Sequence, residues 1–356
     1  MQLFVLVTGC LLWYKHCVMT SLLAASVHHL DPILIEIPGT PLAVRWYGLA
    51  YLAGFVLGYL LLLHLSKRKL YCVEPEKLSD FIALQVCLIG VVCGGRLGEF
   101  FFYWLPKYGL SGFWNDPTWV FRVWEGGMAS HGGIIGVVLM ALYYAKSNQL
   151  SFPAVLDGLA IAAPIGLFFG RVANFINGEL YGRVCEATSS LAMKFPLSFY
   201  ELPRLTRDRA YIALEQAMQT PFPNLFLRDK QGKFAEDEDA MLCRMCRESD
   251  TFRETLGGFL EPRYPSQLFE ALGEGLLIFL VLIAIRLRWK NAPAGLFAGL
   301  FGVLYAVARI TCEFYKEPDD VVWYGITKGQ WLSFAIFAAG VAFLFHAFRQ
   351  KKSQNL

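Results

Sequence analysis

The segment 170–183 carries the densest set of polar side chains in an otherwise apolar part of the chain. It reads GRVANFINGELYGR and follows an apolar run at 153–169. An arginine near bilayer hydrocarbon costs roughly 2.5–3.5 kcal/mol on insertion scales, so such a cluster is by default a functional-site hypothesis. Arg171 and Asn174 stand three residues apart, which places both side chains on one helical face. The segment is therefore our first candidate for a binding site.

Three further polar clusters interrupt apolar stretches: His131, the segment 263–270, and the pair Arg309 and Glu313. Glu313 follows Arg309 by four residues, so the two share a helical face. We expect the four clusters to line one cavity. Two arginines that face such a cavity favour an anion, and the common anion in a membrane is a lipid phosphate.

The arginines also have a structural interpretation. An Arg–Glu pair at helical spacing inside a bundle is often a buried ion pair, and for Arg309 and Glu313 alone the two interpretations are equally good. Arg171 has no acidic residue three or four positions away on its own helix. Because an unpaired charge in hydrocarbon is expensive, this favours ligand binding for Arg171.

His131 is the one histidine expected in the core of the membrane spans. A single interior histidine is more often a satisfied core residue than a catalyst. Here Gly132 and Gly133 follow it, so another backbone or a substrate can approach the ring closely. The ordinary pKa of histidine, about 6.5, suits proton transfer. We therefore favour a catalytic role for His131.

Nothing in the sequence indicates a nucleotide-phosphate loop or a metal site. Gly94, Gly95 and Gly98 lie in an expected membrane helix and not between a strand and a helix, so we assign them to helix packing. Asp157 is the only aspartate in the expected spans. The acidic cluster of a magnesium-dependent phosphotransferase is therefore missing. We expect no metal and no cofactor.

The C-x-x-C pair Cys243 and Cys246 lies in a polar region of the chain. A structural zinc site needs four ligands, and no histidine occurs between His131 and His346. We therefore expect either a local disulfide or two free thiols.

The composition indicates a membrane protein. Of 356 residues, 56% are hydrophobic and 17% are charged, and the mean hydropathy is +0.43. The net charge of +3 is small for this length, so it gives no reason to expect a nucleic acid as partner.

We predict an all-α polytopic membrane protein with seven transmembrane helices and an external soluble segment between spans four and five. The spans are expected at 42–65, 81–104, 128–146, 153–169, 267–285, 295–314 and 330–348. Basic residues follow the ends at 65, 285 and 348, which puts the amino end outside and the carboxyl end in the cytoplasm. The chain then divides into an N-terminal extension and external lead-in (1–41), spans one to four (42–183), an external polar head segment (184–262), and spans five to seven with a cytoplasmic tail (263–356).

The motifs resemble those of the prolipoprotein diacylglyceryl transferase family of the bacterial cytoplasmic membrane. The resemblance covers roughly 30–350, and the segment 170–183 looks like the family signature. The other matching motifs are RWYGL at 45–49, GGR at 94–96, FRVWEGGM at 121–128, HGG at 131–133, Arg263 with PSQL at 265–268, Arg309 to Glu313, and GQ at 329–330.

The resemblance implies an enzyme that transfers the sn-1,2-diacylglyceryl group from phosphatidylglycerol to the lipobox cysteine thiol in the signal peptide of a prolipoprotein. The product would be a thioether, with release of glycerol 1-phosphate, as the first step of bacterial lipoprotein maturation. The resemblance also implies a multi-pass protein of the inner membrane that uses no cofactor or metal.

The family's motifs imply that Arg171 contacts the lipid head group and that Arg309 is also essential. Together with the resemblance, the residues predict catalytic roles for His131, Arg171, Arg309, Tyr47, Asn174 and Glu313. The resemblance implies substrate binding by Arg171, Asn174, Glu179, Gly182, Asp157 and Tyr305.

The chemistry requires a base and a clamp for the leaving phosphate. A thiol with an ordinary pKa of about 8.5 must become a thiolate to displace phosphate from a glycerol carbon. His131 is our first candidate for the base. Tyr47 or a water held by Glu313 are the alternatives, in which case His131 only orients the substrate.

Three features depart from the family pattern. Lys316 stands after Glu313 where the family tends to carry an arginine, which keeps the charge but loses the planar guanidinium. The segment between Arg183 and Arg263 is long for the family. Residues 1–27, which we expect to be a signal-like extension, find no counterpart.

The competing class is a transporter or channel for a small anion, because intramembrane arginines also line anion pathways. Such a protein should show repeated halves and interrupted helices, which this sequence does not. A membrane scaffold held by structural ion pairs is a third class.

Overall fold

The computed structural model describes residues 26–36, 43–122, 127–219, 238–317 and 324–354. The chain forms two compact units. The first unit comprises 1–51, 168–273 and 308–331, and the second comprises 52–167, 274–307 and 332–356.

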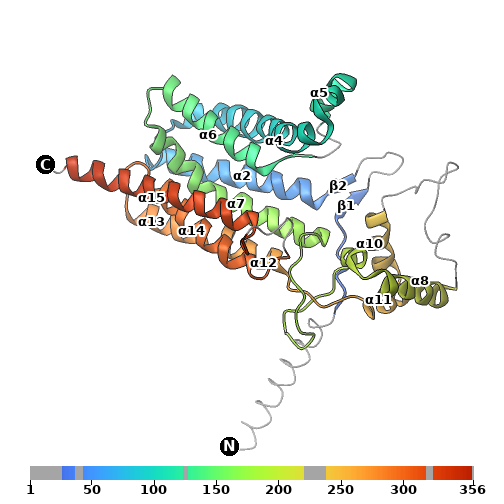
Figure 1. Cartoon of the computed structure of the whole chain (residues 1–356). Helices are drawn as coiled ribbons and strands as arrows, with labels where there is room; N and C mark the ends of the chain where they lie inside the picture. Colours follow the sequence, from blue (N-terminus) through green and yellow to red (C-terminus); the bar gives the residue numbers. More distant parts are fainter. Residues whose placement is uncertain (1–25, 37–42, 123–126, 220–237, 318–323, 355–356) are drawn as a thin grey trace, which may run out of the picture. The chain divides into compact units, whose positions relative to one another are not determined.

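Most of the described chain is helical, and six helices are long and apolar enough to cross a bilayer (Figure 1). They are Trp46–Lys67, Pro75–Gly109, Phe152–Asn177, Ser266–Arg288, Leu296–Glu313 and Gly329–Lys351. The prediction of a helical, polytopic membrane protein is confirmed. The expected third span corresponds to α6 (Ser130–Ser147), whose polar ends lower its mean hydropathy, and its passage through the bilayer stays a prediction.

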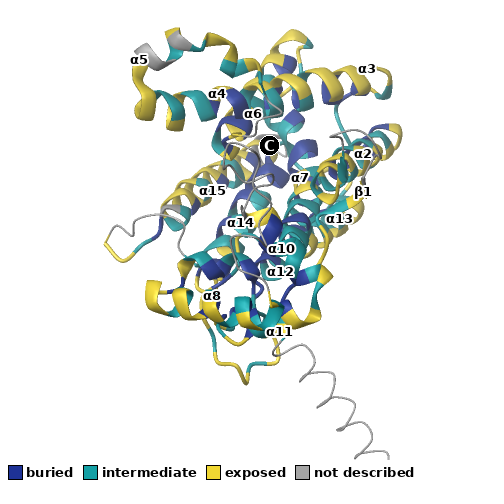
Figure 2. Ribbon diagram, turned by 90° about the vertical axis from the view of Figure 1, so that its right-hand side faces the viewer, coloured by how far each residue is buried: buried dark blue, intermediate teal, exposed yellow. Residues whose placement is uncertain are grey.

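The second unit contains α2 (Trp46–Lys67) from Leu52 onward, followed by a long irregular helix and α6. The irregular helix runs over Pro75–Gly109 and consists of α3 (Pro75–Asp80), the π-helical η1 (Phe81–Cys93), α4 (Gly94–Glu99), the π-helical η2 (Phe100–Trp104) and the start of α5 (Leu105–Asn115). The remainder of α5 follows a kink at Gly109, whose φ is +67°. The buried side chains of Leu62, Phe81 and Tyr144 belong to its core. Figure 2 shows buried residues on α4 and α6, whereas the described part of α5 is largely exposed.

The contact between α4 and α6 depends on glycine. A Cβ atom on Gly132 would lie 2.3 Å from the carbonyl oxygen of Gly94, and one on Gly98 would lie 2.6 Å from the Cα of Gly132. No larger residue fits at these positions without moving the backbone, so the predicted packing role of Gly94 and Gly98 is confirmed. A Cβ on Gly95 would come no closer than 3.6 Å to its neighbours, so close packing does not require a glycine there.

Arg96 on α4 holds the segment that precedes α6. Its side chain is 2% exposed and lies 3.9 Å from the ring centroid of Trp119. It donates hydrogen bonds to the carbonyl oxygens of Trp119, Val120, Arg122 and Gly127. The segment includes the 3₁₀ helix η3 (Pro117–Phe121). Arg96 therefore holds in place the part of the chain that leads into α6 and His131.

The remaining helices of the second unit are the N-terminal part of α7 (Phe152–Asn177), α13 (Ile278–Arg288), most of α14 (Leu296–Glu313) and α15 (Lys328–Gln354) from Leu332 onward. Glycines again allow close approach, since a Cβ on Gly340 would lie 2.8 Å from the backbone nitrogen of Val303. The short η6 (Ala271–Leu277) precedes α13.

The first unit begins with an antiparallel pair, β1 (Ile33–Glu36) and β2 (Ala43–Arg45), which leads into α2. Much of the unit is the polar segment 184–262, whose described elements are η5 (Pro196–Glu201), α8 (Arg204–Met218), α10 (Glu238–Glu248) and α11 (Asp250–Gly257). Apolar residues at four-residue spacing, such as Phe252 and Leu256, form a small core of their own. Ser249 caps α11 by accepting a hydrogen bond from the Phe252 amide at 3.1 Å.

The cysteines of the C-x-x-C pair lie one turn apart on α10 and are free thiols. Burial raises the pKa of Cys243 to about 11 and that of Cys246 to about 12. Both thiols are therefore protonated at neutral pH, which makes them poor nucleophiles. Of the two states expected from the sequence, the free thiols are confirmed.

Candidate active site

A buried carboxylate joins the two arginines that the sequence singled out, and all three residues belong to the first unit. Glu270, the last residue of α12 (Ser266–Glu270), is 0% exposed. Its Oε2 lies 3.3 Å from Nη1 of Arg171 on α7, and its Oε1 accepts a hydrogen bond from Nη1 of Arg309 on α14. Three helices far apart in the sequence thus bring their charges together.

Arg309 has a second acidic partner on its own helix. Its Nη2 lies 2.9 Å from Oε2 of Glu313, so the predicted pairing across four residues is confirmed. The expectation that Arg171 lacks an acidic partner is wrong. Neighbours three and four residues away identify partners on the same helix only, whereas Glu270 approaches Arg171 from another helix.

Glu313 is also tied to the start of α15. The Thr327 hydroxyl donates to Oε1 of Glu313 at 2.8 Å. Thr327 and Gln330 form a capping box, in which the Thr327 amide donates to Gln330 Oε1 at 3.1 Å and the Gln330 amide donates to Thr327 Oγ1 at 3.2 Å. Gly329 leaves room for the acid, because a Cβ there would lie 3.1 Å from both Glu313 oxygens.

The turn that follows α7 brings a carboxylate partner, Glu179, to the Asn174 side chain. Gly178 has a φ of +71°, which ends the helix. Asn174 then donates from Nδ2 to Oε1 of Glu179 at 2.8 Å, and the same nitrogen lies 3.5 Å from the hydroxyl oxygen of Tyr47. Asn174 is buried, so this amide is held in a fixed orientation.

Two residues of α12 hold the backbone beyond this turn. Gln267 donates from Nε2 to the carbonyl oxygen of Glu179 at 2.7 Å, and the Ser266 hydroxyl donates to that of Leu180 at 3.2 Å. Both side chains are completely buried. The short helix that carries Glu270 therefore also fixes the backbone of the segment 170–183, called the signature segment below.

Gly182 lies where three chain segments meet. The Gly182 amide donates a hydrogen bond to the carbonyl oxygen of Tyr264 at 2.8 Å. Gly182 also forms an isolated antiparallel β-bridge with Lys316. A Cβ on Gly182 would lie 2.4 Å from the carbonyl oxygen of Tyr315 and 2.6 Å from that of Tyr264. This close approach explains why a glycine stands at position 182, whether or not the residue contacts substrate.

Arg263 binds the polar head segment to the signature segment. Its guanidinium contacts Glu201 Oε2 at 2.7 Å and Glu317 Oε2 at 3.1 Å, and donates to the Gly182 carbonyl oxygen at 3.3 Å. The Tyr181 hydroxyl donates to Glu201 at 2.5 Å. Burial and this hydrogen bond to a carboxylate raise the pKa of Tyr181 well above its usual value, so it stays a neutral donor.

Three of the four expected polar clusters meet in the first unit: the signature segment, the segment 263–270, and Arg309 with Glu313. His131 belongs to the second unit, where it lies half-buried in the first turn of α6. Tyr305 also belongs to the second unit, and its ring stacks on that of Phe301 at 5.6 Å.

Asp157, in the second unit, accepts two backbone hydrogen bonds at the start of α14. The amide of Gly295 donates to Oδ2 and the amide of Ala298 donates to Oδ1, each at 2.8 Å. The carboxylate thus satisfies amide groups that a helix start leaves without partners. These bonds account for a half-buried acid at this position, and its predicted contact with substrate stays a prediction.

Sequence reasoning placed Glu270 in a polar cluster but gave it no role, and it did not single out Thr327 or His28. His28 is 4% exposed, its ring stacks on Phe195 at 5.5 Å, and a Cβ on Gly178 would lie 3.0 Å from its Nδ1. Burial lowers the pKa of His28 to about 4. A capping-box search over 327–330 finds Thr327, whereas His28 carries no local signal.

The cluster formed by Arg171, Arg309, Glu270 and Glu313 has a formal charge of zero. Each guanidinium offers five N–H donors in a plane, of which a carboxylate engages a subset. The arrangement can therefore bind an oxyanion without a net buried charge at rest. Among the described residues, no group of three or more His, Cys, Asp or Glu side chains is placed to hold a metal ion.

The model of the family described as prolipoprotein diacylglyceryl transferase matches residues 32–346. A phosphatidylglycerol–prolipoprotein diacylglyceryl transferase from Bdellovibrio bacteriovorus is 38% identical over 330 residues, which cover 88% of this chain and 92% of the relative. Proteins of the same name from Burkholderia thailandensis and Burkholderia mallei are each 36% identical over 326 residues, covering 90% of this chain and 95% of each relative.

Proposed function

The chain belongs to the prolipoprotein diacylglyceryl transferase family, and from that membership we infer that it is an enzyme that transfers a diacylglyceryl group from phosphatidylglycerol to prolipoproteins. The observation that carries the assignment of the site is Glu270, which bridges Arg171 and Arg309 in a buried cluster. We propose that this cluster is where the lipid phosphate binds.

The phosphate changes charge during the reaction, and this decides what the arginines contribute. Phosphatidylglycerol carries a phosphodiester with one negative charge, whereas the leaving glycerol 1-phosphate is a monoester that gains a second. The charge develops on the oxygen that leaves carbon. Guanidinium groups fixed beside that oxygen bind the transition state more tightly than the substrate, which lowers the barrier.

Glu270 keeps the two guanidiniums together before the lipid arrives. Two arginines in a low-dielectric environment repel each other and tend to turn toward water. A carboxylate with one oxygen on each of them holds both in place, so little reorganisation is needed when phosphate binds. Arg171 and Arg309 would then donate N–H groups to the phosphate oxygens.

The transfer step itself is a substitution at carbon. The cysteine sulfur attacks the glycerol carbon that bears the phosphate, forming the C–S bond of a thioether. The C–O bond breaks, and its electron pair goes to the phosphate oxygen. The thiol proton goes to a base, for which we propose His131, since histidine exchanges protons near neutral pH.

Tyr47, Asn174 and Glu179 would form the polar wall beside the phosphate. Their hydrogen-bonded network presents hydroxyl, amide and carboxylate groups, which match the hydroxyl groups of a glycerol head group. Glu313 orients Arg309, and Gly182 permits the close packing beneath the site. Tyr305 and Asp157 stay predicted substrate-binding positions.

We place the protein in the bacterial inner membrane, with the amino end outside and the segment 184–262 external. The charge bias of the span ends supports this orientation. The acceptor would be the lipobox cysteine of a prolipoprotein signal peptide. The family match argues against a small-anion transporter.

The test uses purified protein, phosphatidylglycerol labelled in its diacylglyceryl part, and a lipobox peptide. We expect label on the peptide cysteine, and folded protein that transfers none would refute the function. Arg171→Ala should abolish turnover while the protein stays folded in detergent. Full activity in that variant would remove the phosphate-binding role of Arg171.

A further inference from the structure

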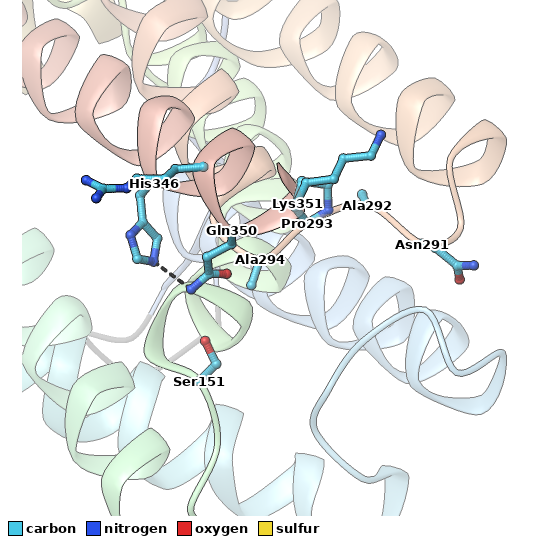
Figure 3. Close-up of a pocket in the computed structure, with 9 residues that line it drawn as sticks. Ser151, Asn291, Ala292, Pro293, Ala294, His346, Gln350 and Lys351 are labelled. Carbon is cyan, nitrogen blue, oxygen red and sulfur yellow. Dashed lines mark hydrogen bonds between the residues drawn. The ribbon is translucent and has the colours of Figure 1, made fainter. Parts of the chain in front are cut away.

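The second unit holds a polar cavity at the ends of its helices (Figure 3). The cavity has a volume of about 910 Å³ and is lined by Ser151, Asn291, Ala292, Pro293, Ala294, His346, Arg349, Gln350 and Lys351. Three segments contribute: the residue before α7, the loop between α13 and α14, and the last turns of α15. The short side chains at 292–294 leave this space open.

The lining suits an anion. Arg349 and Lys351 make it positive, and none of the nine described residues that line it is acidic. Gln350 lies beside His346 with 3.0 Å between Nε2 atoms, so amide and imidazole groups add further polar contacts. Ser151 directly precedes α7, which places the cavity at the positive end of that helix dipole.

The surroundings of the cavity are those of a membrane interface. The Lys351 ammonium lies 4.5 Å from the ring centroid of Trp289, and tryptophan is enriched where membrane helices meet water. Next to the basic residues on α15, Phe345 is 69% exposed and Phe348 is 51% exposed. These rings provide an apolar surface for acyl chains beside a positive cavity.

We propose that this cavity binds the phosphate head group of an anionic phospholipid from the adjoining leaflet. Its volume falls within the range of about 300–1,000 Å³ that is usual for small-molecule sites. Basic pockets between membrane helices recognise such head groups. A free phosphate ion has the same charge but no use for the exposed phenylalanines. Under the proposed topology the leaflet is the cytoplasmic one, and the lipid is bound there without being consumed.

The test compares two double variants of the full chain, delipidated in detergent. Arg349→Gln with Lys351→Gln removes both cations of the cavity. Lys67→Gln with Arg68→Gln removes the same charges from the exposed end of α2. The control lies near the same helix ends, because the Tyr71 hydroxyl in the adjoining loop donates to the Val155 carbonyl oxygen of α7 at 3.0 Å.

Binding of phosphatidic acid is measured by native mass spectrometry, with phosphatidylcholine and inorganic phosphate as the other arms. Two basic contacts at about 1 kcal/mol each correspond to a loss of roughly 30-fold in affinity in the cavity variant. The control variant should bind like the wild type. Phosphatidylcholine should bind every variant equally, and inorganic phosphate should not displace the lipid at matched concentration.

Three results would overturn the proposal. Equal affinity in the cavity variant and the wild type would show that the cavity binds no head group. An equal loss of affinity in the Lys67 and Arg68 variant would show that any basic residues at the helix ends attract the lipid, without a specific site. Displacement by inorganic phosphate would assign the site to a soluble anion. Peptide lipidation, measured on the same samples, should be unchanged in both variants, which separates this site from the transferase site.

Discussion

Replacing Glu270 by glutamine tests the central ion cluster. The amide has nearly the same shape, so the change removes charge and leaves no cavity. With glutamine the cluster formed by Arg171, Arg309 and Glu313 carries one net positive charge, and the NH₂ group of the new side chain faces a guanidinium. Breaking a buried ion pair by removing one partner costs about 3–5 kcal/mol.

The same change should reduce turnover more than lipid binding. The extra positive charge still attracts the phosphate, whereas the guanidiniums lose the group that holds them in place. If about 3 kcal/mol of transition-state stabilisation is lost, kcat/KM falls by roughly 100-fold, mostly through kcat. The assays are peptide lipidation at varied phosphatidylglycerol concentration and thermal unfolding in detergent.

Glu201→Gln is the matched control for Glu270→Gln. Glu201 also pairs with an arginine, but its side chain is 46% exposed and Arg263 keeps Glu317 as a partner. Because the Glu201 carboxylate reaches water and Arg263 keeps a second acidic partner, this variant should be destabilised far less than Glu270→Gln. A double-mutant cycle of Glu270→Gln with Arg171→Gln should give a coupling above about 1 kcal/mol. Wild-type turnover and melting temperature in Glu270→Gln would refute the reasoning.

Three further changes test individual contacts. Gly182→Ala should lower the free energy of unfolding by about 1–3 kcal/mol, because the new Cβ meets two carbonyl oxygens. Gly170→Ala is the control and should be tolerated, since a Cβ there has nothing within 4 Å. Equal melting temperatures of the two variants would contradict this prediction. Asp157→Ala leaves the amides of Gly295 and Ala298 without their acceptor, so the melting temperature should fall. The KM for lipid should not rise. A raised KM would instead support a contact between Asp157 and the substrate. For His28, the pKa falls from 6.5 unfolded to about 4 folded, so stability is fully present above pH 6.5 and decreases by up to ~3 kcal/mol toward pH 4. His28→Phe should flatten that part of the stability profile, and an unchanged slope would show that another group titrates.

Sequence reasoning worked best where a contact is local along a helix. The pairing of Arg309 with Glu313 follows from a spacing of four residues, and the structure confirms it. The packing role of Gly94 and Gly98 follows from small residues on a membrane helix, which is also confirmed. These predictions need only the geometry of one helix.

The same reasoning could not find contacts between distant segments. Glu270 lies 99 positions after Arg171 and 39 before Arg309, so no spacing rule connects it with either residue. The two carbonyl oxygens that exclude a side chain at Gly182 come from Tyr264 and Tyr315, which lie 82 and 133 positions further along the chain. Tertiary packing decides both features.

The main-chain contacts around Gly182 place the same demand on lysine and on arginine at position 316. The signature segment, the start of α12 and the end of α14 are joined there through main-chain atoms: Gly182 pairs with Lys316, and Arg183 donates from Nε to the Lys316 carbonyl oxygen at 2.9 Å. A main-chain acceptor is the same in lysine and arginine. These main-chain contacts can therefore form with either residue at position 316. The glycine at 182 is more restricted, because no other residue can replace it without moving the backbone.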